Sequence, residues 1–578
     1  MPFKRRTLLL ALAASILAGC GKPATSLEKS PDKYPVSPDA LKVPAQGKFG
    51  GRIVLPLLRP PRTFNPLAAI DIDTREVTGL LHAGLLEFDH ASLKITPGLA
   101  AAWKVEDSGK TYLLQLRKGV YFSDERPFGA DDVIATLDAI YADNSNNALR
   151  DDWILHDRKI KYRKISQDSV ELAFPFVYAP ALYLISTLPI LPKHLLELRG
   201  GAPVESIMTL ESSPEQCAGL GPYRLKDFKN KETVVLEPNP HYWKVDLSGR
   251  RLPYLSELLL PVVSSKDSAF IQFRSGSVDM VDRLRVQDYS ALVGKPVKDL
   301  EVRNAGASTK LDMLWVNQNS QFRSPKAAYF KNPNFRQALA RAIDRQAIIR
   351  NVYKGYAEIL SELWPTSLRD WASDRPPYPY DQKQALELFA KAGLRLVENN
   401  GARRMVDSAG NQFSLLLLTN VDPAKEAIAT LLQEDFRRVG IRLQINVSDM
   451  RAVQDRFLTK RDYEMMLFSS AFPADPSQIQ GVLKSRGQQH MWNPAQSSPA
   501  TPWEAEIDRL TDEMLSSPDS KTYRGRFLKI QQILMEQLPV IPLVSEHVLV
   551  GFRKNVVNVK PSVLPSHLLW NAWEIYTN

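Results

Sequence analysis

The chain has 578 residues, with 74 lysines and arginines against 64 aspartates and glutamates, so its formal net charge is +10 at neutral pH. A chain of this length exceeds what one hydrophobic core usually supports, which predicts two or three lobes. The positive excess is mild for this length, and no basic run in the sequence is interleaved with aromatic residues. These features exclude nucleic acid as a partner.

The first twenty residues have the pattern of an export signal. A basic head at residues 4–6 precedes an apolar run, residues 8–18, that is too short to cross a bilayer as a helix. The motif Leu-Ala-Gly-Cys at residues 17–20 resembles a bacterial lipobox, which implies removal of residues 1–19 as a signal peptide and acylation of Cys20. Acyl chains on Cys20 hold a protein on a membrane, so the expected location is the periplasm or cell envelope, lipid-anchored to a membrane.

Three questions stay open at this end of the chain. An ordinary secretory signal can carry a cysteine at its cleavage site by chance. The pair Arg5-Arg6 is compatible with twin-arginine export as well as with the general export route. Gly21 is not the aspartate associated with inner-membrane retention in many Gram-negative bacteria, so the sequence does not decide between the inner and the outer membrane.

Residues 20–47 are rich in proline, serine, lysine and aspartate and have no helical or strand periodicity. This composition predicts a flexible tether between membrane and body. The second cysteine, Cys217, has no partner once Cys20 is lipidated, so neither a disulfide framework nor a cysteine metal site is expected. No second apolar segment approaches membrane-spanning length, and we expect the folded body to be tethered outside the bilayer.

The body shows alternating helix and strand patterns. In residues 422–447, apolar residues recur at helical spacing as far as Phe436, Gly440 ends the helix, and residues 441–447 alternate apolar and polar as a strand does. Earlier in the chain, residues 112–117 alternate as a strand, and two acids at 131–132 mark the start of a helix. Helix, short turn and alternating strand recur along the chain, which indicates an α/β fold.

The sequence contains no recognisable catalytic constellation. Its eight histidines are scattered, with no pair spaced to present two zinc ligands from one helix, and no nucleophile elbow or phosphate-binding loop is present. The pairs Asp131-Asp132 and Asp151-Asp152 are better explained as helix caps or solvated loops than as acid/base pairs. We therefore expect a binding protein and not an enzyme, with no catalytic residue, metal or cofactor.

Nine segments, in order along the chain, resemble one family: the bacterial extracellular solute-binding proteins of the oligopeptide/dipeptide class, known as family 5. Members of this family are the receptor components of ATP-driven importers. The segments are "RTFNPLAAID" (62–71), "LLHAGLLEFD" (80–89), "PGLAAAWKVEDSGKTYLLQLRKGVYFSDERPFGADDV" (97–133), "GLGPYRL" (219–225), "LEPNPHYWK" (236–244), "LPYLSEL" (252–258), "FRQALARAIDRQAII" (335–349), "YDQKQALELFAKAG" (380–393) and "LPVIPLVSE" (538–546).

The resemblance implies a two-lobed α/β periplasmic-binding-protein fold, type II, of the large class with an accessory third domain and a hinge between the lobes. We expect a monomer, which closes on its ligand and then docks on the permease subunits of an ABC importer in the membrane. By this resemblance the chain divides into lobe I (48–82), the accessory domain inserted in it (83–212), lobe I again (213–305), lobe II (306–545) and a return to lobe I (546–578), with the crossings near Ala305 and Glu546.

The ligand is expected in the interlobe cleft. In many peptide-binding members, a segment W-x-A-D-Y-x-x-P carries an aspartate that pairs with the peptide's amino terminus. Aligning Pro476 with that proline places Ser469 at the aromatic position and Phe472 at the aspartate. The candidate ligand-binding residues are Ile70, Asp71, Ile72, Asp73, Trp315, Asn317, Ser469, Ser470, Ala471, Phe472 and Asp475.

The departure at Phe472 leaves the ligand class open. A buried ammonium needs a charged partner, and Asp71, Asp73 or Asp475 could supply it. A peptide is the leading ligand, and an amino-sugar, an opine or a metal chelate is the alternative within the same fold. An exported hydrolase or a structural envelope protein is the alternative from another class.

Overall fold

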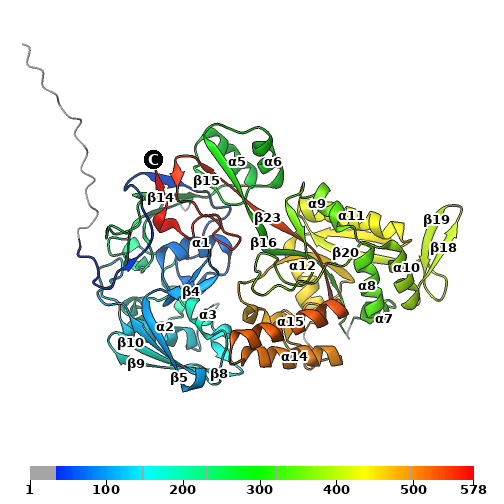
Figure 1. Cartoon of the computed structure of the whole chain (residues 1–578), viewed down its shortest axis with the longest axis horizontal. Helices are drawn as coiled ribbons and strands as arrows, with labels where there is room; N and C mark the ends of the chain where they lie inside the picture. The colour runs from blue at the N-terminus through cyan, green and yellow to red at the C-terminus, as the bar shows by residue number, and fades with distance from the viewer. Residues whose placement is uncertain (1–33, 145–146, 148, 230–231, 320–321, 495) are drawn as a thin grey trace, which may run out of the picture.

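The computed structural model describes residues 34–578 except 145–146, 148, 230–231, 320–321 and 495. The predicted signal peptide (1–19), the lipidation site Cys20 and the first part of the predicted tether lie outside the described residues. Two α/β bodies lie side by side, and two long strands run diagonally from one to the other (Figure 1). No helix among the described residues is both long enough and apolar enough to cross a membrane.

The segments expected to form lobe I, and called by that name below, contain a four-stranded mixed sheet of order β11-β12-β14-β2. Strand β2 pairs in parallel with β14, whereas the other neighbours are antiparallel. Residues Val234 to Leu236 are buried, which places β12 inside the lobe. The elements are α1 (Ile72–Leu81), β2 (Arg52–Val54), β11 (Tyr223–Lys229), β12 (Thr233–Pro238), β14 (Glu257–Pro261), α5 (Lys266–Ser275), β15 (Met280–Val281) and α6 (Val286–Gly294).

Residues 83–212, the segment expected to form the accessory domain and called by that name below, contain a second, antiparallel sheet of order β5-β6-β10-β9, packed with helix α2 (Figure 1). Helix α2 begins where the two acids were predicted to mark a start, and the backbone N–H of Gly129 donates to Asp132 Oδ2 at 2.9 Å. The elements are β3 (Leu86–Asp89), β4 (Lys94–Pro97), β5 (Ala100–Glu106), β6 (Thr111–Leu116), α2 (Ala130–Tyr141), β7 (Ile154–Leu155), β8 (Arg158–Lys159), β9 (Lys161–Ser166), β10 (Ser169–Ala173), α3 (Ala181–Ser186) and α4 (Lys193–Leu198).

Lobe II is built on the larger sheet, of order β15-β23-β16-β22-β20-β21, with β17 on β23. The predicted helix, glycine turn and strand are confirmed as α11, Gly440 with φ +81°, and β21. The elements are β16 (Leu300–Val316), α7 (Ala327–Lys331), α8 (Pro333–Ala342), α9 (Arg345–Asn351), β17 (Ala357–Ile359), α10 (Gln382–Lys391), β18 (Arg395–Asn399), β19 (Ala402–Val406), β20 (Ser414–Asn420), α11 (Pro423–Arg438), β21 (Arg442–Ser448), α12 (Met450–Gln454), β22 (Met465–Ala471), α13 (Gln480–Leu483), α14 (Pro502–Leu515), α15 (Ser520–Gln537) and β23 (Val540–Arg553).

The strands β16 and β23 run antiparallel and connect the lobes. Their pairing is regular from Leu300 to Asn304, but the register shifts between Asn304 and Leu311, opposite Ser545 to Leu549, and once more between Asp312 and Met313. Irregular pairing bends a strand locally, so this stretch is where the connection can flex. The expected crossing points, Ala305 and Glu546, lie within it.

Residues 34–47 form a strap on the body, although we expected them to belong to a flexible tether. Strand β1 (Leu41–Lys42) pairs in parallel with β13 (Lys244–Val245). The guanidinium of Arg251 donates to the carbonyl of Pro35 at 2.7 Å. A two-residue strand has no periodicity that a sequence pattern could reveal. The expectation of a flexible tether is therefore wrong for residues 34–47.

Near the C-terminus, the strands β24 (Val556–Val557) and β25 (Tyr576–Thr577) pair antiparallel and form a small two-stranded sheet.

Candidate ligand-binding cavity

A cavity of about 1080 Å³, here called the main cavity, lies between the accessory domain, helix α1 and the loops of lobe II that follow β22. Its walls are polar and charged as well as aromatic. The accessory domain contributes Asp151, Asp152 and Asp157, and α1 contributes Arg75. Lobe II contributes Ala471 to Ala474, Gln478, Gln480, Gly481 and the run Arg486 to Gln489.

The two sides of the main cavity touch each other beside it. The backbone N–H of Ala179 in the accessory domain donates to the carbonyl of Leu515 at the end of α14, at 2.8 Å. A second contact joins His156 Nε2 to Asp512 Oδ1 at 3.2 Å. A solute in the main cavity would therefore contact both sides and would be partly enclosed by them.

Charges of both signs face the main cavity. Burial raises the pKa of Asp152, and the neighbouring Asp151 raises it further while Arg75 lowers it. The Nε of Arg75 donates to the carbonyl of Ala69 at 3.0 Å, which holds the guanidinium near the lobe I wall. Walls with carboxylates and guanidinium groups suit a solute that carries both a positive and a negative group.

Two smaller cavities adjoin the main cavity. One, of about 350 Å³, shares Arg75, Asp152, Ser186, Thr187 and Gln478 with it. The other, of about 210 Å³ and here called the side pocket, shares Phe88, Tyr183 and Ala474 with the main cavity, and its other lining residues include Leu182, Asp370, Trp371 and Asp475. The binding space is thus branched.

The loop after β22 lines the main cavity in part, but not all of its candidate ligand-binding residues do so. Ala471 and Phe472 line the main cavity, and Asp475 lines the side pocket. Ser469 and Ser470 are the next residues back along β22, and the hydroxyl of Ser469 donates to Asp312 at 2.6 Å. Ser469 is therefore engaged in lobe II.

Phe472 occupies the position where many relatives were expected to carry the amine-binding aspartate. Only 6% of the residue is exposed, and its ring packs edge-on against Trp364 at 5.8 Å between centroids. Its backbone N–H donates to the carbonyl of Thr309 at 2.8 Å. Phe472 therefore anchors the loop in lobe II and presents no charge to the main cavity.

The candidate segment Ile70 to Asp73 lies at the start of α1, where it is not among the residues that line these cavities. Asp71 caps the helix by accepting from Thr74, and Asp73 pairs with Arg283 at 3.1 Å. Ile70 and Ile72 are exposed. Arg75, one turn further along α1, is the residue of this region that lines the main cavity.

The candidates Trp315 and Asn317 lie inside lobe II. Trp315 is buried and borders a minute void of about 10 Å³. The side-chain amide of Asn317 donates to the carbonyls of Arg461 and Tyr463, at 3.1 and 2.7 Å. These contacts favour a structural role for both residues at the end of β16.

The main cavity is also lined by residues that the sequence does not single out: Asp151 and Asp152, whose pairing favours a cap or a solvated loop, and the polar run at 486–489. Asp151 is exposed and Asp152 half-buried, but both face the main cavity. The available signal was weak in each case, because neither segment has a pattern beyond a polar loop. Among the described residues, no group of three histidine, cysteine or acidic side chains is arranged to hold a metal ion.

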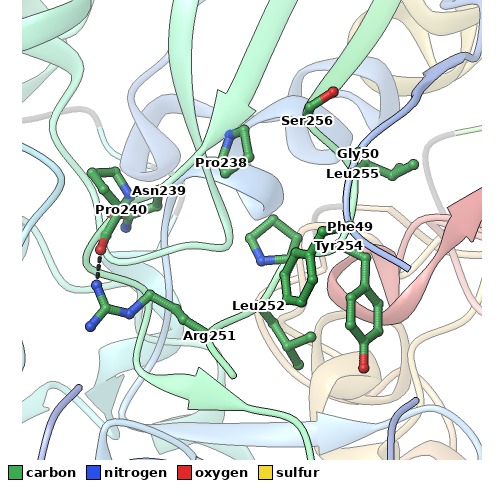
Figure 2. Close-up of a pocket in the computed structure, with 11 residues that line it drawn as sticks. Phe49, Gly50, Pro238, Asn239, Pro240, Arg251, Leu252, Tyr254, Leu255 and Ser256 are labelled. Carbon is green, nitrogen blue, oxygen red and sulfur yellow. Dashed lines mark hydrogen bonds between the residues drawn. The ribbon is translucent and has the colours of Figure 1, made fainter. Parts of the chain in front are cut away.

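A further cavity, of about 330 Å³, lies on lobe I and is lined only by residues 49–50, 238–240 and 251–256. Figure 2 shows the rings of Phe49 and Tyr254 along one side and the guanidinium of Arg251 directed at the carbonyl of Pro240. No residue of lobe II lines this cavity, so closure of the lobes would not change it.

Two α/β bodies joined by two long strands, with a cavity between them, define a two-lobed solute-binding protein. Residues 94–489 match the family model described as bacterial extracellular solute-binding proteins, family 5 Middle. This match covers more than half of the chain, and the chain therefore belongs to bacterial extracellular solute-binding protein family 5.

Curated relatives are similar over most of their length. The oligopeptide-binding protein AppA of Bacillus subtilis (strain 168) is 25% identical over 552 residues, covering 93% of each chain. A probable ABC transporter-binding protein of Deinococcus radiodurans is 24% identical over 575 residues, covering 94% of this chain and 93% of the relative.

Solved structures share the fold, which is the type II periplasmic-binding-protein fold. AppA from Bacillus subtilis in complex with a nonapeptide has a TM-score of 0.70 at 23% identity, over 92% of this chain and 100% of that one. NikA from Brucella suis in complex with Fe(III)-EDTA has a TM-score of 0.77 at 18% identity, over 91% and 100%.

Proposed function

We propose that this protein captures a peptide or peptide-like solute in the main cavity and delivers it to the permease subunits of an ABC importer. The observation that carries the proposal is the main cavity itself, about 1080 Å³ in volume and walled by both sides of the molecule. Its volume lies at the upper end of the range usual for small-molecule sites, which suits a ligand larger than a single amino acid.

Capture needs only a difference in contact energy between two arrangements of the lobes. A solute that touches Arg75 or Asp152 on one side and Gln478 or Arg486 on the other makes its full set of contacts only when the lobes are together. That difference shifts the population towards the closed form. The irregular pairing of β16 with β23 is where the bend would take place.

The charge pattern supports a peptide-like ligand, because a peptide carries an ammonium and a carboxylate at its two ends. Among the solved relatives, AppA was crystallised with a nonapeptide, whereas AgaA holds agropinic acid and NikA holds Fe(III)-EDTA. An opine, an amino-sugar or a metal chelate is therefore the alternative ligand for the same cavity.

We further propose that the protein lies in the periplasm or cell envelope, is held to a membrane through lipid on Cys20, and acts as a monomer without catalysis. The lipobox-like motif at residues 17–20 supports the anchor.

Lipidation of Cys20 can be tested by labelling. Radiolabelled palmitate should be incorporated into the exported chain and should be absent from Cys20→Ser.

Protein purified without denaturation is expected to release a small solute that mass spectrometry detects. After removal of that solute, adding it back should raise the melting temperature and reduce the radius of gyration in solution scattering, because the closed form has more contacts. Empty protein that responds to no member of peptide, opine, amino-sugar or metal-chelate panels would contradict the proposal. Product formation on a substrate panel would favour the hydrolase instead.

Filling the main cavity is expected to abolish capture. Gly481 lines the cavity, and a Cβ built on it meets no atom within 4 Å, so the backbone at this position has room for a side chain and Gly481→Phe places a ring at the cavity wall. Gly525 on α15 is equally open but lies away from the cavity, which makes Gly525→Phe the matched control. We expect Gly481→Phe to weaken binding of the co-purified solute at least tenfold and Gly525→Phe to leave it unchanged, as measured by calorimetry. Equal affinity of both variants would place the solute elsewhere.

A further inference from the structure

The side pocket has the composition of a site for an organic cation. It lies between the accessory domain, which supplies Phe88 and Tyr183, and lobe II, which supplies Trp371 and Asp475. The rings of Phe88 and Tyr183 meet edge to face at 5.5 Å. At about 210 Å³ the pocket is larger than cavities of about 150 Å³ that accept a benzene-sized guest.

The carboxylate of Asp475 is buried without a cation. The residue is 8% exposed, and its Oδ1 accepts the hydroxyl of Tyr523 at 2.7 Å and the N–H of Ser477 at 2.9 Å. The side chain of Ser477 also hydrogen-bonds to the carboxylate, and within the described part of the chain no lysine, arginine or histidine pairs with it. Burial raises the pKa of Asp475, while its hydrogen bonds lower it. A cation placed beside the carboxylate would offset the cost of that burial.

The aromatic walls are held in position. The indole N–H of Trp371 donates to the carbonyl of Ala474 at 3.1 Å, and the indole packs edge to face on Tyr523 at 5.1 Å. Aromatic faces attract ammonium and guanidinium groups that come within about 6 Å of the ring. Rings on both sides and a buried carboxylate without a cationic partner among the described residues are thus brought together where the two sides of the molecule meet.

We propose that the side pocket binds a protonated amine or guanidinium group of the solute held in the main cavity, with Asp475 as its counter-ion. This inference rests on the proposed function, because the side pocket shares Phe88, Tyr183 and Ala474 with the main cavity. It assigns to Asp475 a charge contact that Phe472 cannot make. The group can belong to the amino terminus of a peptide-like solute or to a basic side chain.

Asp475→Asn is the variant that tests the pocket. An asparagine oxygen can still accept from Tyr523 and Ser477, so the loop should keep its conformation while the negative charge is lost. The matched control is Asp370→Asn, which removes an exposed carboxylate from the rim of the same pocket, where solvent screens it. Phe88→Leu, which removes one ring and keeps Asp475, serves as a second variant.

The first probe is n-butylammonium, compared with n-butanol, in saturation-transfer NMR on the full chain freed of co-purified solute. We expect n-butylammonium to bind at least tenfold more weakly to Asp475→Asn, about threefold more weakly to Phe88→Leu, and unchanged to Asp370→Asn. n-Butanol should not distinguish these proteins. Equal binding of n-butylammonium to wild type and Asp475→Asn would overturn the inference.

The second probe identifies the source of the cation. The tetrapeptides Ala-Lys-Ala-Ala and Ala-norleucine-Ala-Ala are each compared with a free and with an acetylated amino terminus. A tenfold preference for lysine that Asp475→Asn removes assigns the pocket to a side chain, and the same preference for the free terminus assigns it to the terminus. If n-butylammonium binds as expected but all four peptides fail, the pocket stands and the peptide part of the proposed function falls.

Discussion

Replacing Lys425 with methionine is expected to lower the free energy of unfolding by about 3–5 kcal/mol, because it leaves Asp312 charged and buried without a counter-ion. Lys425 Nζ lies 2.6 Å from Asp312 Oδ1, and the two side chains are 4% and 3% exposed. Asp312 also accepts the hydroxyls of Ser469 and Tyr353. The network joins the connecting strand β16 to β22, to Tyr353 just after α9 and to α11, and its loss is expected to loosen the lobe II wall of the main cavity.

Burial alone would raise the pKa of Asp312, but the charge of Lys425 and three hydrogen bonds bring the pKa below its usual value. The stability that Asp312 contributes is therefore present above its unfolded pKa and lost as the pH falls through its folded pKa. Guanidinium denaturation at pH 7 followed by tryptophan fluorescence should show the loss for Lys425→Met.

Two control variants distinguish the destabilisation caused by an unpaired buried charge from any effect of removing a lysine as such. The double variant Lys425→Met with Asp312→Asn should regain most of the stability, because no unpaired charge remains. Lys460→Met removes an exposed lysine that pairs with Asp455 at 2.8 Å, and it should leave the denaturation midpoint unchanged. A midpoint for Lys425→Met equal to that of the wild type would show that Asp312 is not isolated by burial.

Segments whose hydrophobic pattern is local could be predicted from the sequence. In α11 and β21 the apolar stripe, the glycine and the alternation lie within one stretch of chain, and the structure confirms all three. The start of α2 was predicted from its two acids, because an acid near a helix N-terminus satisfies free backbone N–H groups.

Segments that depend on a distant partner could not be predicted in this way. Strand β1 exists because Leu41 pairs with Lys244, about two hundred positions away in the chain, and its own two residues carry no strand pattern. The main cavity has the same origin: Arg75, Asp152 and Arg486 meet only in the folded chain. The family resemblance makes the loop after β22 a ligand-binding candidate, but the burial of Phe472 against Trp364 depends on a partner in another segment, which the order of residues does not reveal.

Removing the charge of Glu76 is expected to change how stability depends on pH. Glu76 lies on α1 beside Arg75 and is almost fully buried, and within the described residues neither of its carboxylate oxygens has a hydrogen-bond partner. Arg283 approaches it only to 4.0 Å and lies at 3.1 Å from both Asp73 and Asp282. One guanidinium thus serves three carboxylates.

Burial, and after it the charge of Asp282, raises the pKa of Glu76 to about 8, although Arg283 opposes the shift. The folded pKa lies above the unfolded value, so the folded chain holds a proton that the unfolded chain releases from about pH 4.5 upwards. The stability that this proton contributes is complete below about pH 4.5 and is lost as the pH rises through about 8. From pH 5 to pH 8 the loss amounts to about 3 kcal/mol.

Glu76→Gln should therefore be less sensitive to pH than the wild type, and the readout is the difference in unfolding free energy between pH 5 and pH 8. The glutamine amide is buried without partners as well, but that cost is the same at both pH values and cancels. Glu398→Gln, which alters an exposed glutamate paired with Arg403, should keep the pH dependence of the wild type. If Glu76→Gln loses as much stability between pH 5 and pH 8 as the wild type does, the expectation is wrong. Glu76 would then already be ionised in the folded chain at pH 5, with Arg283 compensating the charges of three carboxylates. That result would require Arg283 to lie closer to Glu76 than 4.0 Å in solution.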